Sequence, residues 1–372
     1  MLNVLTIAPY NFLPPNLGGQ KNIALFYKFF SPLVNLTCVT TKKNETEGVS
    51  GYEILKILSN SRLRYINLFY FFKFRKIIRQ KKITHLILEH PYYGWLGILL
   101  KWTCNIKLVV RSQNIESIRF KSIGKWWWGI LWHYERATHK RAHINFFIQE
   151  DDRKYGIEKF GLDPEKCFII TYGFELTGKP SPGDRQEAKN FICNSYGINK
   201  DSLILLFNGS LGYKPNLDAV EVILKKINPL LCARENFNYR MIICGNKLPA
   251  KYKNLEDYKE KNIIYTGFVD DITVFYKGAD IFINPVIDGG GIKTKVVEAL
   301  GYDLSVISTA SGAIGISPSI TGNKMKIFAD TDWENFAEQV FQLNTDANIP
   351  DEYFDNFYWG NIAAKACSWL NT

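Results

Sequence analysis

The sequence predicts an α/β protein built from two doubly wound, Rossmann-like domains, each with a parallel sheet covered by helices on both faces. Its length of 372 residues suits two or three domains that each bury a core of their own. Short runs rich in β-branched and aromatic residues alternate with helical stretches, and near-continuous apolar strands of this kind are typical of parallel sheets. The segment 177–184, with two glycines and two prolines, separates two halves of similar size.

The expected strands follow one another through both halves. In the first half they are expected at 4–8, 36–40, 85–89, 107–111, 144–148 and 167–171. In the second half they are expected at 203–208, 240–244, 263–266, 281–284, 305–308 and 325–328. A capping-box pattern at 331–334 predicts the start of a late helix, and 359–370 is expected to form the last one. We therefore expect a first domain at 1–178, a second at 185–349 and a C-terminal helical segment at 350–372.

Composition excludes several classes of protein. Hydrophobic residues make up 46% of the chain and charged residues 22%, which excludes a disordered or collagen-like chain. No run of 18 apolar residues occurs, so a transmembrane helix is not expected, and the first residues indicate a strand rather than a signal peptide. The seven cysteines are odd in number and never form a CxxC pair, which predicts free thiols in a reducing cytoplasm.

Basic residues are concentrated in the first half. Residues 1–175 carry 26 basic and 13 acidic side chains, a net charge of +13, whereas the remainder carries 20 basic and 23 acidic ones, a net charge of −3. The stretch 62–82 has eight basic residues, no acidic one and six aromatic residues, and 125–132 holds four tryptophans. Anionic lipids attract such surfaces, so these two segments predict a cytoplasmic protein that binds peripherally to the inner face of the cell membrane.

Two alternative roles for these segments stay open. The aromatic side chains can belong to the core, with lysines extending from helix faces into solvent. Nucleic acid binding is the second alternative and is disfavoured, because the chain has no helix-turn-helix, zinc-finger or RNP-like motif.

Three glycine-containing segments, at 17–20, 208–214 and 288–300, follow expected strands. In doubly wound sheets, ligands bind beyond the carboxyl ends of the strands, so these loops indicate the binding edge of each domain. The first segment precedes a helix that is expected to begin near Asn22. The third is the most informative, because three consecutive glycines expose backbone N–H groups just before a helix start.

The residues after this glycine triplet favour a phosphorylated ligand. Lys293 and Lys295 fall in the first turn of the expected helix, where cations are unfavourable unless an anion lies nearby. Glu298, one turn later, is placed to accept hydrogen bonds from two adjacent hydroxyls, as on a ribose. The alternative is a tight turn followed by solvated lysines.

The segment 289–300, with Gly301 and the strand at 305–308, resembles the nucleotide-sugar site of the retaining glycosyltransferases of family four. Other segments resemble parts of that family in the same order: the glycine loop at 18–19, the Asn-x-Glu element at 114–116, the first strand and loop of the donor domain at 207–216, and the base-contacting turn at 265–271. Trp359 and the last helix resemble the tail that crosses back onto the first domain. The resemblance implies the GT-B fold, in which two Rossmann-like domains face a central cleft.

The resemblance implies transfer of a sugar from a nucleoside-diphosphate-sugar to a glycan or lipid-linked acceptor in surface-polysaccharide assembly, with retention at the anomeric carbon. The first domain would bind the acceptor and the second the nucleotide-sugar, which is a co-substrate, and no cofactor is implied. The catalytic groups facing the diphosphate and the sugar would be Lys293, Lys295, Gly290 and Gly291. The other donor-binding groups would be Glu298, Gly19, Gly209, Lys214, Gly267 and Phe268.

The chain departs from the family pattern at two informative positions. Gly290 stands where many members carry a first glutamate, and Gln113 stands where many carry histidine before the Asn-x-Glu element. On the acceptor side the candidates are His90, Gln113 and Glu116. The departures keep open a nucleotide-sugar-binding module with weak catalysis. A sugar-nucleotide epimerase is a second alternative, because such enzymes also have two domains of this kind, but the convergent set of acidic residues that epimerisation needs is not found in the sequence.

No metal ion is expected at this site. No His/Asp/Glu cluster at metal-ligand spacing accompanies the glycine loops. Asp151 and Asp152 follow an expected strand, and carboxylates at such a junction more often cap a helix. Backbone amides and the two lysines would instead stabilise the charge that develops on the leaving diphosphate.

Overall fold

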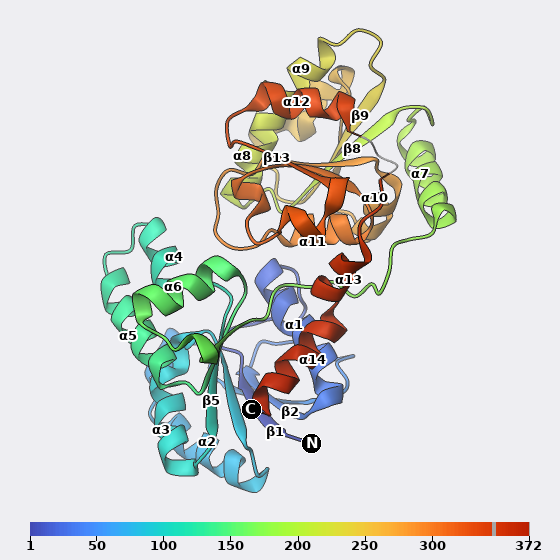
Figure 1. Cartoon of the computed structure of the whole chain (residues 1–372). Helices are drawn as coiled ribbons and strands as arrows, with labels where there is room; N and C mark the ends of the chain where they lie inside the picture. The colour runs from blue at the N-terminus through green and yellow to red at the C-terminus, as the bar shows by residue number, and fades with distance from the viewer. Residues whose placement is uncertain (344–346, 372) are drawn as a thin grey trace. The chain divides into compact units, whose positions relative to one another are not determined.

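The computed structural model describes residues 1–343 and 347–371, which divide into two compact units (Figure 1). The first unit comprises Met1–Gly173 together with the chain from Trp359 onward, and the second comprises Phe174–Tyr358. Each unit is built around a parallel sheet of its own. The predicted α/β fold class, with two doubly wound domains, is therefore confirmed.

The first sheet has seven strands in the order β3-β2-β1-β4-β5-β6-β7, so the strand order reverses between β1 and β4. The strands are β1 (Asn3–Ile7), β2 (Asn35–Thr41), β3 (Glu53–Leu58), β4 (His85–Glu89), β5 (Lys107–Ser112), β6 (Ile144–Phe147) and β7 (Cys167–Ile169). The α-helices of this unit are α1 (Gly18–Phe30), α2 (Phe69–Gln80), α3 (Gly94–Cys104), α4 (Glu116–Ser122), α5 (Trp128–Arg141), α6 (Glu150–Phe160) and α14 (Trp359–Leu370).

Helices cover both faces of the first sheet. On one face, α2 and α3 contribute Phe74 and Leu96 to a buried apolar cluster with strand residues. On the other face, α14 packs beside α1, with Trp359 against Phe26 at a ring-centroid distance of 6.4 Å. The last helix thus completes the first unit, although it follows the second unit in the sequence.

The second sheet has six strands in the order β10-β9-β8-β11-β12-β13, which reverses between β8 and β11. The strands are β8 (Leu203–Asn208), β9 (Tyr239–Cys244), β10 (Ile263–Gly267), β11 (Ile281–Asn284), β12 (Ser305–Thr309) and β13 (Met325–Phe328). The α-helices are α7 (Pro182–Tyr196), α8 (Lys214–Val222), α9 (Asn228–Cys232), α10 (Ile272–Gly278), α11 (Thr294–Gly301), α12 (Trp333–Gln342) and α13 (Asp351–Phe357). Side chains of α8, α9 and α12 share one buried cluster on this sheet.

The twelve predicted strands are all present, with ends that differ by at most two residues. The thirteenth strand, β3, was not predicted, because it is a half-exposed edge strand whose apolar run is interrupted by exposed Glu53 and Lys56. The expected start of the first helix near Asn22 is wrong, since α1 begins at Gly18 and includes the glycine pair in its first turn. Of the two helices after Pro350, α13 belongs to the second unit and α14 to the first.

Candidate functional site

Two loops approach each other where the strand order of the second sheet reverses. One follows β8 and runs into α8, and the other follows β11 and carries the glycine triplet 289–291 into α11. Gly289 (φ +91°) and Gly291 (φ +75°) adopt a backbone conformation that favours glycine. A Cβ atom on Gly289 would lie 3.0 Å from the Tyr213 hydroxyl, so the two loops lie close together. Doubly wound sheets bind ligands at this edge.

Lys293 and Lys295, named here the lysine pair, lie at the start of α11. The Lys293 ammonium donates to the carbonyl oxygens of Gly289 (2.6 Å) and Gly291 (3.0 Å). Burial lowers the pKa of Lys293 to about 8, although nearby carboxylates partly oppose this. Two carbonyl oxygens of the glycine triplet thus hold the Lys293 ammonium group in place.

The Lys295 ammonium is held by the loop after β8. It donates to the carbonyl oxygen of Asn208 (3.2 Å) and to the side-chain oxygen of Asn216 (2.9 Å). Burial, with a smaller contribution from Lys293, lowers the pKa of Lys295 to about 7. Lys295 therefore shifts between its charged and neutral forms near neutral pH.

The lysine pair lacks an ionic partner within the part of the chain that the structure describes. Neither ammonium group lies within 4.0 Å of a described carboxylate oxygen, and both donate to neutral oxygen atoms. A partly buried cation without a counter-ion is electrostatically unfavourable. An anion bound beside the pair would remove this cost, and a helix start with exposed N–H groups favours the same occupant.

Glu298 lies one turn along α11 from the lysine pair. The buried Tyr276 hydroxyl, at the end of α10, lies 3.4 Å from its carboxylate and accepts a hydrogen bond from the Asn208 side chain at 2.9 Å. Burial, followed by the charge of Glu298, raises the pKa of Tyr276 well above its usual range, so the hydroxyl keeps its proton. Through Asn208, the structure joins Glu298 to Lys295.

Three further predicted donor-binding residues, Gly209, Gly267 and Phe268, lie at or just after the carboxyl ends of strands in the second sheet. A Cβ atom on Gly209 would lie 2.7 Å from the Asn216 side-chain nitrogen, so any other residue there would have to displace the Asn216 side chain. Gly267 has φ +72° and is followed by the exposed Phe268 at the end of β10. A Cβ atom on Gly290 would have no neighbour within 4 Å among the described residues, which leaves its backbone open.

Lys214 differs from the lysine pair. Its side chain is 79% exposed and forms an ion pair with Asp218, one turn further along α8. The ion pair and the exposure indicate a surface lysine of α8. The structure thus brings Lys293, Lys295 and Glu298 into one network and leaves Lys214 outside it.

The acceptor-side candidates His90 and Glu116 lie together in the first unit. His90 Nδ1 lies 3.1 Å from one Glu116 carboxylate oxygen, and the Tyr92 hydroxyl donates to the other at 2.6 Å. Arg119 also donates to this carboxylate, through Nε at 2.9 Å. Although burial raises it, His90 and Arg119 lower the pKa of Glu116 to about 2, so the carboxylate stays charged.

Gly19 and Gln113 lie beside this pair. A Cβ atom on Gly19 would lie 3.1 Å from the Gln113 side-chain oxygen and 3.8 Å from the Tyr10 hydroxyl. The Tyr10 hydroxyl is 3.0 Å from His90 Nε2. Loops after β1, β4 and β5 therefore bring these residues to the carboxyl edge of the first sheet, and we name the group Tyr10, Gly19, His90, Gln113 and Glu116 the polar cluster.

Several residues of the two networks were missed by sequence reasoning. Tyr10, Tyr92, Arg119 and Tyr276 stand in no motif, and only the fold brings them to their partners. Glu135 on α5 is a further example, since its carboxylate accepts from the backbone N–H groups of two residues at the start of α4 at 2.9 Å. Burial raises the pKa of Glu135 to about 7. No local sequence signal would have identified these side chains.

Within residues 1–343 and 347–371, no group of three His, Cys, Asp or Glu side chains is placed to hold a metal ion. Asp151 and Asp152 lie in the first turn of α6, where carboxylates interact favourably with the helix dipole.

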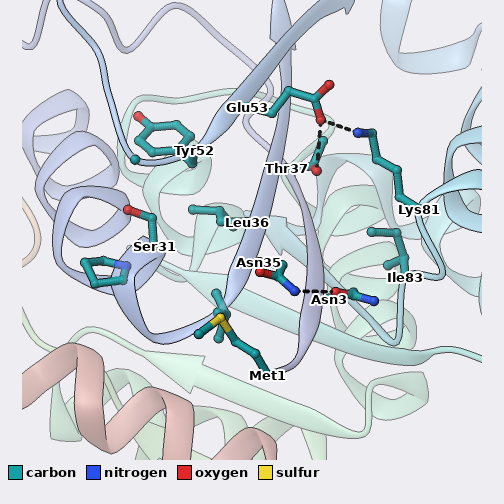
Figure 2. A pocket seen from close by; sticks show the side chains of 13 residues that line it. Met1, Asn3, Ser31, Asn35, Leu36, Thr37, Tyr52, Glu53, Lys81 and Ile83 are labelled. Atoms are coloured by element: carbon teal, nitrogen blue, oxygen red, sulfur yellow. Dashed lines mark hydrogen bonds and ion pairs between the residues drawn. The ribbon is translucent and has the colours of Figure 1, made fainter.

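A hollow of about 570 Å³ lies elsewhere on the first unit, around the amino ends of β1, β2 and β3 (Figure 2). Its charged groups compensate each other, because Lys81 pairs with Glu53 at 2.5 Å, and Thr37 donates to the same carboxylate at 3.3 Å. Asn35 donates to Asn3 beside them at 2.8 Å. The hollow lies at the edge opposite the polar cluster and contains none of the predicted site residues.

The basic and aromatic segments of the first unit are partly core and partly surface. Tyr70, Phe74 and Ile78 of α2 are buried against the sheet. Large apolar side chains on the other side of the segment 62–72 are exposed, and these are Leu63, Ile66, Leu68, Phe69 and Phe72. Trp126 and Ile130 are exposed in the second segment. No helix in the described parts of the chain is long and apolar enough to cross a membrane.

Two family models match the two halves of the chain. The model described as Glycosyltransferase Family 4 matches residues 35–177, and the model described as Glycosyl transferases group 1 matches residues 202–346. A curated relative from Klebsiella pneumoniae, named "Uncharacterized 44.6 kDa protein in cps region", is 25% identical over 377 residues, which span 93% of this chain and 90% of the relative.

Solved structures share the fold over the whole chain. HepE of Anabaena, crystallised in complex with UDP, has a TM-score of 0.72 at 12% identity, with 100% of both chains covered. WaaG, described as a glycosyltransferase involved in lipopolysaccharide biosynthesis, has a TM-score of 0.66 at 14% identity, with 99% of both chains covered. These likenesses show the fold, and the two family models show the family. The chain belongs to the glycosyltransferases of the family-four type, with the GT-B fold.

Proposed function

We propose that this glycosyltransferase is a retaining, metal-independent hexosyltransferase that uses a nucleoside-diphosphate-sugar. One observation carries the proposal: the lysine pair follows a glycine triplet at the reversal point of the second sheet and has no carboxylate partner among the described residues. This arrangement fits a diphosphate better than a neutral ligand, because the hydrogen-bond acceptors of both ammonium groups are neutral oxygen atoms and a bound anion would compensate their charge.

The chemistry follows from where negative charge develops. When the bond between the sugar and the diphosphate breaks, charge grows on the β-phosphate, which is the leaving group. The lysine pair and the backbone amides of Gly290 and Gly291 would stabilise that charge, and their fixed positions avoid reorganisation during the reaction. Glu298 would hold the ribose hydroxyls, and the turn at Gly267 and Phe268 would contact the base. The ammonium groups would supply the charge that a metal ion supplies in other transferases.

The acceptor is proposed to be a glycan or a lipid-linked glycan in surface-polysaccharide assembly. The relative in a cps region and the lipopolysaccharide transferase WaaG support this class of acceptor, and the UDP complex of HepE supports a uridine donor. The first domain would bind the acceptor, with His90, Gln113 and Glu116 as its candidates.

We further propose that the protein works at the inner face of the cell membrane through α2 and the segment before it. Five exposed apolar side chains lie there together with exposed basic residues, among them Arg62, Lys73 and Arg79. Aromatic side chains settle at the headgroup level, and each basic residue near an anionic surface contributes roughly 1 kcal/mol. A lipid-linked acceptor would then lie within reach of the enzyme.

A thermal-shift panel of UDP, GDP, ADP, dTDP and CMP tests the donor site. A ligand at about 100 times its Kd stabilises its site by about 2.7 kcal/mol. Glu298→Ala should weaken binding by roughly 1.5–3 kcal/mol, because it removes hydrogen bonds to a charged group. Glu187→Ala, an exposed position on α7, is the matched control and should bind as the wild type does. If no nucleotide shifts the wild-type protein, the donor-site proposal fails.

Turnover separates a transferase from a binding module. The wild-type enzyme with the nucleotide-sugar of the best nucleotide should release that nucleotide and glycosylate membrane lipid extract, and the activity should persist in EDTA. NMR of the product should show the anomeric configuration of the donor. Tight nucleotide binding with neither hydrolysis nor transfer would favour the module that the departures at Gln113 and Gly290 leave open.

A further inference from the structure

Three buried polar side chains of the second unit join the loop that carries the glycine triplet to the loop after β12. Asn284 is the last residue of β11, Ser308 is its register partner on β12, and Thr309 ends β12. All three have an exposed fraction of 0%. Buried polar groups are costly unless they are hydrogen-bonded, so their partners show what they hold together. We name Asn284, Ser308 and Thr309 the buried clamp.

Thr309 connects the two loops directly. Its hydroxyl donates to the carbonyl oxygen of Val286 at 2.5 Å and accepts from the Gly312 N–H group at 3.1 Å. Val286 lies three residues before the glycine triplet, and Gly312 lies in the loop after β12. One side chain therefore sets the spacing between the two loops.

Asn284 and Ser308 hold the same loop from the strand ends. The Asn284 amide group donates to the Ser308 hydroxyl at 2.9 Å and to the Gly312 carbonyl oxygen at 3.2 Å. The Ser308 hydroxyl donates in turn to the Thr309 carbonyl oxygen at 3.1 Å. A Cβ atom on Gly312 would lie 2.6 Å from the Ser308 hydroxyl oxygen and 2.8 Å from that of Thr309, so the clamp packs directly against this backbone. Gly312 is thus held at both its N–H and its C=O group.

The loop after β11 leads from the clamp to Lys293. Two carbonyl oxygens of the glycine triplet accept hydrogen bonds from the Lys293 ammonium, which favour its charged form, whereas burial lowers its pKa to about 8. The charged groups that act on the lysine pair from neighbouring elements are Asp288 and Asp330, and the two lysines also act on each other. Asp330 accepts from the N–H group (2.9 Å) and the hydroxyl (2.6 Å) of Ser311, in the loop that the clamp holds. The surroundings of Lys293 therefore depend on where the clamp fixes the two loops.

We propose that Asn284, Ser308 and Thr309 are positioning residues of the donor site, which hold the glycine triplet where its carbonyl oxygens meet the Lys293 ammonium. They act through the loop backbone, and a loop that is fixed in advance loses less conformational freedom when a ligand binds. The Asn284 side-chain oxygen is buried without a partner among the described residues, a cost that stability alone does not explain. The inference rests on the proposed function for the role of Lys293 toward a diphosphate.

Thr309→Val removes the hydroxyl and keeps the shape of the side chain. In titration calorimetry, UDP should bind this variant about threefold to tenfold more weakly than the wild type, the loss expected for one hydrogen bond. Thr309→Ser keeps the hydroxyl and should bind as the wild type does. Thr321→Val is the matched control, because Thr321 is also fully buried and donates to the Pro318 carbonyl oxygen at 3.0 Å, ahead of β13. It should lower Tm and leave UDP affinity unchanged; wild-type affinity in Thr309→Val, or an equal loss in Thr321→Val, would overturn the proposal.

Carbon-13 NMR of the lysine side chains gives a second readout that needs no nucleotide. In Thr309→Val the pKa of Lys293 should fall below its wild-type value of about 8, because the ammonium loses hydrogen bonds that favour the charged form. The value should not move in Thr309→Ser or Thr321→Val, and an unchanged pKa in Thr309→Val would contradict the proposal. Absence of UDP binding by the wild type would count against the proposed function, whereas this titration would still decide the role of the clamp.

Ser308→Ala is the milder variant and serves if Thr309→Val does not fold. It removes one acceptor of the Asn284 amide and leaves the Thr309 hydroxyl in place. UDP affinity should fall about twofold to fivefold, at the lower end for one hydrogen bond. A folded Ser308→Ala protein with wild-type affinity would overturn the proposal.

Discussion

The Lys295 ammonium donates a hydrogen bond to the Asn208 carbonyl oxygen at 3.2 Å, so the last residue of β8 holds a lysine from the start of α11. The side chain of the same asparagine donates to Tyr276, which contacts Glu298. One residue thereby connects the cation proposed for the diphosphate with the carboxylate proposed for the ribose. A substitution at Lys295 should therefore alter the position of Glu298, and a substitution at Glu298 should alter that of Lys295.

Lys295→Met should separate binding from stability. Methionine keeps the length and apolar packing of the side chain but removes a partly buried cation without a counter-ion, so unliganded protein should gain about 1 kcal/mol, or roughly 2–4 °C in Tm. The same change removes a charge-assisted contact to the diphosphate, and the thermal shift with UDP should fall to near zero. Differential scanning calorimetry with and without UDP measures both effects. A variant that loses stability and keeps its UDP shift would show that Lys295 is structural.

The lysine pair also predicts how UDP affinity depends on pH. A bound diphosphate favours the protonated lysines, so it raises their pKa values above about 7 for Lys295 and about 8 for Lys293 in the free protein. Affinity is therefore full below about pH 7 and falls as the pH rises through these two values, by up to tenfold per pH unit for each proton taken up. Isothermal titration calorimetry in two buffers of different ionisation enthalpy should detect the proton uptake. Affinity that is flat up to pH 9, or uptake unchanged in Lys295→Met, would contradict this assignment.

The sequence predicted most strands, and the glycine-rich turn before the start of α11, for a physical reason. Buried parallel strands are continuous apolar runs, and the glycine triplet requires positive φ angles, so both leave local signals. The edge strand β3 leaves no such signal, because only part of it is buried. The start of α1 was missed since Gly18 and Gly19 are poor helix formers, yet Gln20 accepts from the backbone N–H of Leu17 at 3.0 Å and holds the first turn.

The partners of the site residues could not be predicted in this way. Tyr276 lies 22 residues before Glu298 in the chain, and Tyr10 lies 80 residues before His90. Such contacts depend on which strands are neighbours in the sheet. Lys214 was predicted to bind phosphate from its place after a glycine loop, and its ion pair with Asp218 of the same helix was likewise not predicted.

Tyr276→Phe tests the network behind Glu298. Loss of the hydroxyl leaves the Asn208 side chain without its acceptor and removes a donor facing Glu298, so UDP affinity should fall by about threefold to tenfold, in line with one hydrogen bond. Tyr196→Phe on α7 is the control, with an expected affinity equal to that of the wild type. Titration calorimetry measures both variants. Equal affinities for wild type and Tyr276→Phe would remove the tyrosine from the donor site.

Gly209→Ala tests the loop after β8. The new methyl group would lie 2.7 Å from the Asn216 side-chain nitrogen and must displace it, and Asn216 is one of the two groups that hold Lys295. We expect a loss of stability of about 1–3 kcal/mol, as for other overpacked positions, together with weaker UDP binding. Gly178→Ala, where a Cβ atom meets nothing described within 4 Å, is the control. Unchanged UDP binding in a folded Gly209→Ala protein would show that the position of Asn216 does not matter.

The double variant Phe69→Ser/Phe72→Ser tests the membrane surface. These two side chains are 75% and 66% exposed, so their replacement should leave the fold intact while removing apolar area that a bilayer would bury. A buried phenylalanine contributes roughly 1.5–3 kcal/mol, so the partition coefficient onto vesicles containing phosphatidylglycerol should fall at least tenfold. Phe191→Ser on α7, also exposed, is the control and should sediment with vesicles as the wild type does.

Since the basic residues of the segment act through charge, wild-type binding should also weaken as salt increases. Wild-type protein that stays in the supernatant at low salt would refute the surface, and equal loss in Phe191→Ser would show that binding is not specific to α2.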